Sequence, residues 1–141
     1  MLYEIINRLN EEQLKDVFHM CKQEWWGKER EYHDFHRAVE NSNFVVAFTT
    51  SETNKVIAFA RVITDFAYKA ILLDVIVESS YQKTGLGREL MEYISNHPKL
   101  KSVYIFDLFC MPDLVPFYEK WGFVDSLGEV RCMRRIGKPH E

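Results

Sequence analysis

Two apolar runs separated by an amphipathic helix constrain the fold of this chain more than any other feature. Residues 70–77 form a dense aliphatic run, typical of a central strand that is buried on both faces. The next segment has the period of an amphipathic helix that ends before Pro98, and its apolar side chains are Leu86, Leu90, Met91 and Ile94. Residues 103–109 are again apolar. This order predicts a parallel strand pair, because the helix supplies the crossover between the strands.

The other segments add strands and helices around this pair. Asn10 with Gln13 three residues later predicts a capping box at the start of the first long helix. Further helices are expected over 32–41 and 112–120, and further strands over 1–7, 44–49, 56–64 and 129–136. Because 44–49 and 56–64 would form a hairpin, the sheet is mixed. The predicted fold class is α/β, in a single domain over residues 1–141.

Charge and cysteine content exclude several classes of protein. Eighteen Lys and Arg against 21 Asp and Glu give a net charge of −3, whereas a dedicated nucleic-acid binder usually has a basic excess. The three cysteines are isolated and odd in number, so they form no disulfide framework. His19 and Cys21 alone are too few ligands for a metal. We therefore expect neither nucleic acid nor metal as a partner.

The start of the sequence and the length of its apolar runs bear on where the protein resides. The acidic start of the sequence lacks the basic and apolar regions of a signal peptide. No run approaches 18 apolar residues, the length that would span a membrane. The expected location is the cytoplasm, a reducing compartment, with no membrane partner.

A polar turn leads from the aliphatic run into a helix that begins with glycines. Backbone N–H groups at a helix N-terminus lack partners and favour anions. Gly85 and Gly87 remove side chains that would keep a pyrophosphate from these amides, and Lys83 and Arg88 would add charge-assisted contacts. Two interpretations remain open on these residues alone: a phosphate-binding loop, or a flexible loop whose glycines serve helix–strand packing.

Two motifs in this part of the chain resemble those of the GNAT acyltransferase superfamily. Residues 77–87 match V-x-x-x-Y-[RQ]-x-x-G-x-[GA], and residues 117–123 match F-Y-x-x-x-G-F. The expected order of elements, over nearly the whole chain, is similar to that fold. The resemblance implies a parallel strand pair splayed around acetyl-CoA, which acts as cosubstrate without a metal. It implies acetyl transfer to a primary amine of a small molecule or a protein, and it allows a homodimer.

The resemblance also assigns roles to individual residues. Val75, Ile76 and Val77 would offer backbone groups to the pantetheine arm of acetyl-CoA. Phe117 and Tyr118 would lie beside the thioester. The pyrophosphate loop would consist of Gln82, Lys83, Thr84, Gly85, Leu86, Gly87 and Arg88.

Two side chains are candidates for proton transfer. Tyr118 would protonate the departing thiolate, since a phenol with a pKa of about 10 is a suitable donor; the alternative is a core tyrosine. Asp74 interrupts an apolar strand and is the candidate general base. Some members of the superfamily have a glutamate base on this strand, but the corresponding position here is Ile71. The alternative for Asp74, and equally for Asp107, is a buried contact with Arg61, Tyr104 or a backbone amide.

Trp25 and Trp26 are the candidate acceptor-binding residues. They follow the first predicted helix, in a region that shapes the acceptor site of the superfamily. Adjacent tryptophans cannot both point into a core, although a packing role for the pair is the alternative. The expected function is an N-acetyltransferase; the alternatives are a CoA-binding sensor or partner-binding module without turnover, and a ligand-binding domain unrelated to CoA.

Overall fold

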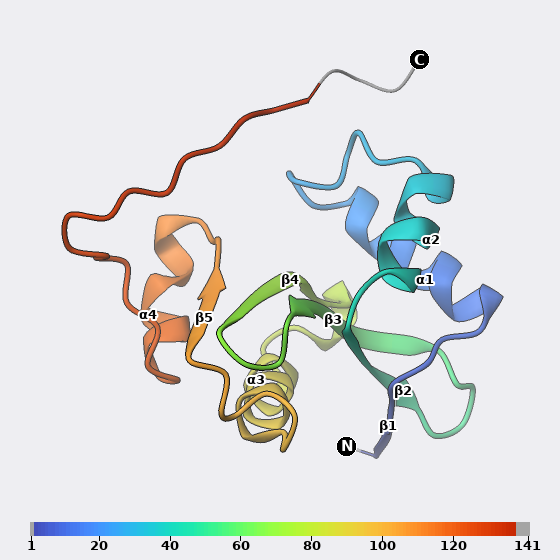
Figure 1. Ribbon diagram of the computed structural model, residues 1–141. Helices are drawn as coiled ribbons and strands as arrows, with labels where there is room; N and C mark the ends of the chain where they lie inside the picture. The colour runs from blue at the N-terminus through green and yellow to red at the C-terminus, as the bar shows by residue number, and fades with distance from the viewer. Residues whose placement is uncertain (1, 138–141) are drawn as a thin grey trace. The chain divides into compact units, whose positions relative to one another are not determined.

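The computed structural model describes residues 2–137, which fall into two compact units divided between Phe109 and Cys110. Met1, the first residue of the predicted strand 1–7, lies outside the described residues. The first unit contains the sheet (Figure 1). Its elements are β1 (Tyr3–Ile6), α1 (Glu11–Lys22), α2 (Tyr32–Glu40), β2 (Phe44–Thr50), β3 (Val56–Thr64), β4 (Lys69–Val77), the short 3-10 helix η1 (Ser79–Tyr81), α3 (Leu86–Asn96) and β5 (Ile105–Leu108).

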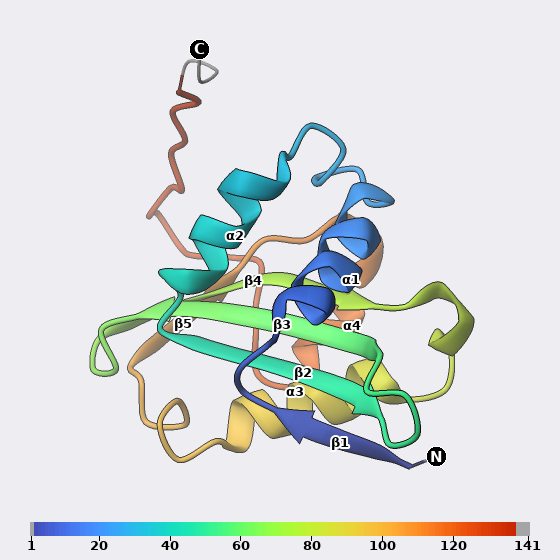
Figure 2. The ribbon, with the colours of Figure 1, turned by 90° about the vertical axis from the view of Figure 1, so that its right-hand side faces the viewer.

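The five strands form one mixed sheet in the order β1-β2-β3-β4-β5. The first three pairings are antiparallel, and β4 and β5 are parallel. The predicted parallel pair is therefore confirmed, with α3 as its crossover. Figure 2 shows α1 and α2 on one face of the sheet and α3 on the other.

The helix boundaries follow from local sequence signals. The Asn10 side chain accepts a hydrogen bond from the Gln13 backbone, and the Gln13 side chain accepts one from the Asn10 backbone, both at 2.9 Å. This confirms the predicted capping box of α1. The helix α3 ends at Asn96, before Pro98, as its pattern predicts.

Each face of the sheet is covered by a separate apolar cluster. Against the face under α1 and α2 lie Leu14, Val17, Cys21, Phe35, Ala47, Val56, Phe59 and Ile76. The apolar stripe of α3 is at most 1% exposed and consists of Leu86, Leu90, Met91 and Ile94. Burial of these side chains from water is the main force that holds the layers together.

The prediction that residues 70–77 are buried on both faces is only partly correct. The strand that is buried almost throughout is β3, whereas β4 alternates between buried and partly exposed residues. In β4 only Ala70, Leu72 and Ile76 are buried. The reason is that β4 leaves its partner β5 halfway along its length, so its second half lies at an opening in the sheet.

The second unit contains a 3-10 helix, η2 (Pro112–Leu114), and α4 (Val115–Glu119). Aromatic rings pack within it: the Phe117 ring centre lies 5.0 Å from that of Tyr118 and 4.9 Å from that of Trp121. The predicted strand over 129–136 is wrong, since these residues form no strand. Their side chains are strand-like in type, but Met133 is 92% exposed, and no backbone ladder is present to hold an extended conformation.

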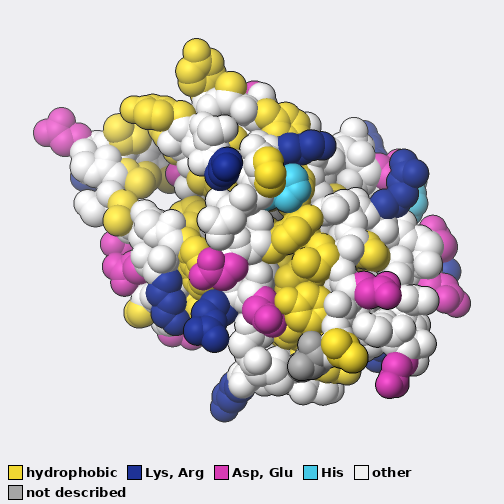
Figure 3. All heavy atoms as spheres, turned by 90° about the horizontal axis from the view of Figure 1, so that it is seen from below, with side chains coloured by type: hydrophobic (Ala, Val, Ile, Leu, Met, Phe, Trp, Pro, Cys, Tyr) yellow, Lys and Arg dark blue, Asp and Glu magenta, His cyan; other side chains and the backbone are white. Residues whose placement is uncertain are grey.

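The surface carries charges of both signs beside exposed hydrophobic side chains. On the face in Figure 3, Lys and Arg are interspersed with Asp and Glu around a band of hydrophobic atoms. No helix among the described residues is long and apolar enough to cross a membrane.

Candidate active site

The candidate site begins where β4 and β5 separate. Their pairing runs from Lys69 opposite Ile105 to Leu72 opposite Leu108 and ends there, although β4 continues to Val77. Beyond Leu72, the edge of β4 that faces away from β3 has no strand partner in the described part of the chain. Peptide groups on such an edge are free to bind a ligand.

A bulge lies at the same point on the other side of β4. Arg61 pairs with Leu73 and Phe59 with Ile76, so Asp74 and Val75 together stand opposite one residue of β3. Asp74 has φ of 55°, in the left-handed region that aspartate tolerates better than most residues. The bulge turns the Asp74 side chain toward cations on neighbouring segments.

Two arginines hold Asp74. The Arg30 guanidinium donates from Nη1 to Oδ2 at 2.7 Å and from Nη2 to Oδ1 at 2.9 Å. The Arg61 Nε donates to Oδ2 at 2.8 Å. The Asp74 side chain is only 3% exposed. Both carboxylate oxygens are thus engaged by charged donors in a nearly dry environment.

These contacts favour one of the two interpretations of Asp74. Burial acts to raise the pKa of Asp74, but the hydrogen bonds from Arg30 and the charge of Arg61 outweigh it, and the pKa lies below its ordinary value. A carboxylate with a lowered pKa and no free oxygen is a weak proton acceptor. The contact with Arg61 that the sequence left open is present. Asp107, the other aspartate in an apolar strand, pairs with Lys69, whose Nζ lies 2.5 Å from Oδ2.

The start of α3 has the free donors that a phosphate needs. Glu89 N–H donates to the Gly85 carbonyl at 3.1 Å, the first bond of the helix. The N–H groups of residues 86–88 therefore have no acceptor within the helix. Gly85 has φ of 90°, and a Cβ there would meet nothing within 4 Å. Glycine at this position is required by backbone conformation, not by lack of space.

The side chains of this loop fall into two groups. Leu86 is buried in the core, so only its backbone can contact a ligand. Gln82, Lys83, Thr84 and Arg88 are exposed. The Gln82 amide donates to the Val77 carbonyl at 3.2 Å, and Thr84 donates to the Tyr81 carbonyl. These two bonds hold the loop beside the end of β4.

The two tryptophans have different environments. Trp25 is 64% exposed, whereas Trp26 packs against the core cluster under α1 and α2. The Arg30 Cζ lies 4.9 Å from the centre of a Trp26 ring, within cation–π range. Of the two, Trp25 is the one whose side chain is open to solvent, and a ligand-binding role for it stays a prediction.

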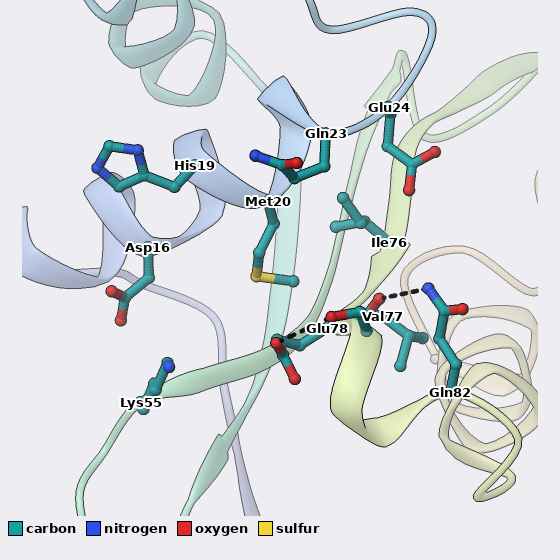
Figure 4. Close-up of a pocket in the computed structure, with 11 residues that line it drawn as sticks. Asp16, His19, Met20, Gln23, Glu24, Lys55, Ile76, Val77, Glu78 and Gln82 are labelled. Atoms are coloured by element: carbon teal, nitrogen blue, oxygen red, sulfur yellow. Dashed lines mark hydrogen bonds between the residues drawn. The ribbon is translucent and has the colours of Figure 1, made fainter.

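A pocket of about 380 Å³ opens between α1 and the end of β4. Figure 4 shows Asp16 and His19 of α1 on one side of it, Ile76 and Val77 on the other, and Met20 pointing toward Glu78. The residues with permanent charge that line it are Asp16, Glu24, Glu78 and Lys55. Carboxylates outnumber the permanent cations, which suits a cationic ligand.

Tyr118 and Phe117 lie in α4 of the second unit. Tyr118 is buried. Burial is the main cause that raises its pKa to about 12, and the charge interaction with Cys110 is the second cause. The phenol therefore stays protonated across the physiological range and keeps its proton available for donation.

Sequence reasoning missed two parts of the site. It did not connect Arg30 with Asp74, which lies 44 positions away. A lone carboxylate in an apolar strand was the available signal, since it requires a buried cation. It also missed the pocket, whose lining residues come from helix, strand and loop positions with no shared sequence pattern.

Comparison with known proteins decides the family. Residues 40–125, more than half of the chain, match the family model "Acetyltransferase (GNAT) domain". The chain belongs to the GNAT acetyltransferase family. A GNAT-family structure from Xanthomonas campestris pv. campestris superposes with a TM-score of 0.81 at 26% identity, covering 97% of this chain and 94% of that one. The family accounts for both sequence motifs and for the mixed sheet.

Two relatives named as N-acetyltransferases are similar in sequence. "Uncharacterized N-acetyltransferase ycf52" of Gracilaria tenuistipitata var. liui is 32% identical over 123 residues, which are 85% of this chain and 66% of that protein. "Serotonin N-acetyltransferase 2, chloroplastic" of Oryza sativa subsp. japonica is 35% identical over 99 residues, 69% of this chain and 50% of that protein. The chain thus spans one half to two thirds of the length of these relatives.

Proposed function

We propose that this protein is an N-acetyltransferase that transfers the acetyl group of acetyl-CoA to a primary amine by direct attack. The observation that carries the proposal is the separation of β4 from β5 after Leu72, next to the N-terminus of α3. A free strand edge and unpaired helix amides then lie on one continuous stretch of chain, residues 73–88. The family membership supplies the reaction class.

The residues present fit acetyl-CoA. The free edge of β4 at Val75, Ile76 and Val77 offers peptide groups to the amide-containing pantetheine arm. The amides of residues 86–88 would bind the pyrophosphate, with Lys83 and Arg88 exposed beside them. Gln82 and Thr84 would hold the loop in shape through their backbone contacts. Acetyl-CoA supplies the activated acetyl thioester.

Proton transfer and charge stabilisation fall to the protein. Backbone N–H groups near Val75 would stabilise the oxyanion that forms on the thioester carbonyl. Tyr118 would donate its proton to the departing thiolate, with Phe117 packed against it. Because Asp74 is held by two arginines, we propose that water, rather than Asp74, removes the proton from the acceptor ammonium.

The pocket beside β4 is the proposed acceptor site. Glu24 and Glu78 line this pocket, and their negative charges would favour an ammonium group in it. The rice relative is named for serotonin, an amine, which supports a small amine as acceptor. The exposed Trp25 would offer an aromatic face to such a ligand. A lysine of a protein is the other acceptor class.

Both units are proposed to form one acetyltransferase domain. The family match at residues 40–125 crosses the boundary between Phe109 and Cys110. A cytoplasmic location and a homodimer stay predictions. The chloroplastic name of the rice relative makes a plastid stroma the alternative location.

A thiol-release assay tests the proposal. The protein is incubated with acetyl-CoA and, in separate reactions, with arylalkylamines, polyamines, amino acids and lysine peptides, and free CoA thiol is measured. Amine-dependent release with acetylated product by mass spectrometry is the expected result. Saturable CoA binding without turnover on any amine would support the sensor alternative, and no CoA binding would contradict both.

A further inference from the structure

Three side chains from three separate segments meet at the bulge of β4. Arg30 comes from the loop after α1, Arg61 from β3 and Asp74 from β4 itself. Arg30 makes the two-pronged contact with Asp74 and also faces the Trp26 ring. It is the member of the cluster that lies outside the sheet, so its contacts join the loop to the sheet.

Both segments that this cluster joins, the loop after α1 and β4, contribute residues to the lining of the pocket. The pocket is lined by Asp16, His19 and Met20 of α1, by Gln23 and Glu24 at the start of the loop, and by residues 76–78 at the end of β4. Asp74 lies two residues before Ile76, the first residue of β4 that lines the pocket. The Arg30–Asp74 ion pair therefore ties the loop that begins with Gln23 and Glu24 to the strand that ends with Ile76 and Val77.

We propose that Arg30 is a positioning residue that, through Asp74 and Trp26, holds the loop of residues 23–31 against β4 and so sets the width of the pocket. The inference rests on the proposed function for the identity of the pocket's ligand, an amine acceptor. Asp74 acts in it as an anchor for Arg30. The cation–π contact with Trp26 adds a second point at which Arg30 holds the loop.

The buried thiol of Cys21 reports on this loop. Cys21 is 0% exposed, and the charges of Asp74, Arg30 and Arg61 all act on it. Burial is the main cause that raises its pKa to about 12, so it is unreactive while the loop is in place. The loop also folds back onto the Cys21 backbone, whose carbonyl accepts from Glu24 N–H at 3.0 Å. Opening of the loop would expose the thiol.

The test compares Arg30→Met with Lys28→Met in a protein that carries Cys110→Ser and Cys132→Ser. Lys28→Met removes the same charge from an exposed position of the same loop. In Arg30→Met, Asp74 keeps Arg61 as a partner, which spares the fold. The measurements are the rate of Cys21 modification by an aromatic disulfide reagent, the Kd of acetyl-CoA, and KM and kcat for the acceptor.

Arg30→Met is expected to raise the Cys21 modification rate and the acceptor KM by at least about tenfold, with kcat and the acetyl-CoA Kd within about twofold. Arg30→Lys should be intermediate, because an ammonium cannot reproduce the planar fork. Lys28→Met should match the parent in all four measurements. A general structural role would instead lower acetyl-CoA affinity and kcat together with acceptor binding.

Unchanged Cys21 reactivity in folded Arg30→Met would overturn the inference. So would a tenfold increase in Cys21 reactivity without a change in acceptor KM, since the pocket would then not depend on the loop. If no amine is turned over, the proposed function fails, while acetyl-CoA binding and Cys21 reactivity still decide whether Arg30 holds the loop.

Discussion

Arg30 and Asp74, 44 positions apart in the sequence, form a two-pronged ion pair with N–O distances of 2.7 and 2.9 Å. The Asp74 carboxylate lies in the candidate active site, and this pair gives each of its two oxygens a hydrogen-bond donor from Arg30. This geometry separates two roles that the sequence alone left open for Asp74, a base and an anchor.

Low pH should lower the free energy of unfolding, because Asp74 becomes protonated. The pKa of Asp74 is lowered in the folded chain, so its carboxylate stabilises the fold above its ordinary pKa of about 3.9, and this contribution is lost as pH falls through the lower folded value. The free energy of unfolding of Asp74→Asn should therefore depend less on pH below about 4 than that of the parent. Urea unfolding at pH 7 and at acid pH measures this. Identical pH dependence of the two proteins would contradict the anchor role.

The same variant tests the base role. If Asp74 were the general base, Asp74→Asn would depress the rising limb of the pH–rate profile in a protein of normal stability. The anchor role instead predicts a lower melting temperature at neutral pH, with the pH of that limb unchanged, since an amide cannot satisfy two guanidinium groups. Rate profiles and thermal melts on one preparation distinguish the two.

Gly87→Val should weaken CoA binding sharply. Gly87 lies in the first turn of α3, among the amides proposed to bind the pyrophosphate, and a branched side chain there would keep phosphate oxygens away. Glu92→Val is the matched control, since it places the same side chain on an exposed position of the same helix. Calorimetry should show a loss for the first variant only. Equal affinities in two folded variants would exclude the loop as the CoA site.

Tyr118→Phe should separate catalysis from packing. The substitution keeps the ring and removes only the hydroxyl, so acetyl-CoA affinity should change little while turnover falls by about 10²-fold. Because the pKa of Tyr118 is raised to about 12, its ionisation should leave no descending limb in the rate profile of the parent below about pH 11. If turnover survives in Tyr118→Phe, the phenol is structural and water supplies the proton.

Gly27→Ala should destabilise the loop after α1. A Cβ at Gly27 would lie 2.0 Å from the Cys21 carbonyl oxygen, so the backbone must shift. Gly137→Ala is the control, because a Cβ there meets nothing within 4 Å. Chemical denaturation should show a loss of about 1–3 kcal/mol for the first variant and a change near zero for the second. Equal stability would show that the loop adjusts freely.

Local sequence signals predicted the elements whose causes are local. The capping residues Asn10 and Gln13 lie three positions apart, and the stripe of α3 repeats within one helix, so a short window contains all the information. The parallel pairing of β4 with β5 was also predictable, because a helix between two neighbouring strands brings the chain back to pair in the same direction. Gly85 lies at the N-terminus of α3 with φ of 90°, which is a physical reason for a glycine there, while its role in binding pyrophosphate stays a prediction.

Features set by distant partners were not predictable in this way. The bulge at Asp74 depends on the register of β4 against β3, and the divergence from β5 depends on where that ladder ends. Residues such as Val130 and Met133 have strand propensity, but propensity produces a strand only where a partner ladder exists. No local sequence pattern distinguishes Arg30 from an arginine on an exposed surface.

Amide-resolved NMR during a titration with CoA tests the central claim most directly. The claim is that CoA lies along the free edge of β4 and on the N-terminus of α3. The largest saturable shift changes are expected at the amides of residues 75–77 and 86–88, with little change in β1 and β2. Saturable changes confined to other segments, or no saturable change at any amide, would contradict the account.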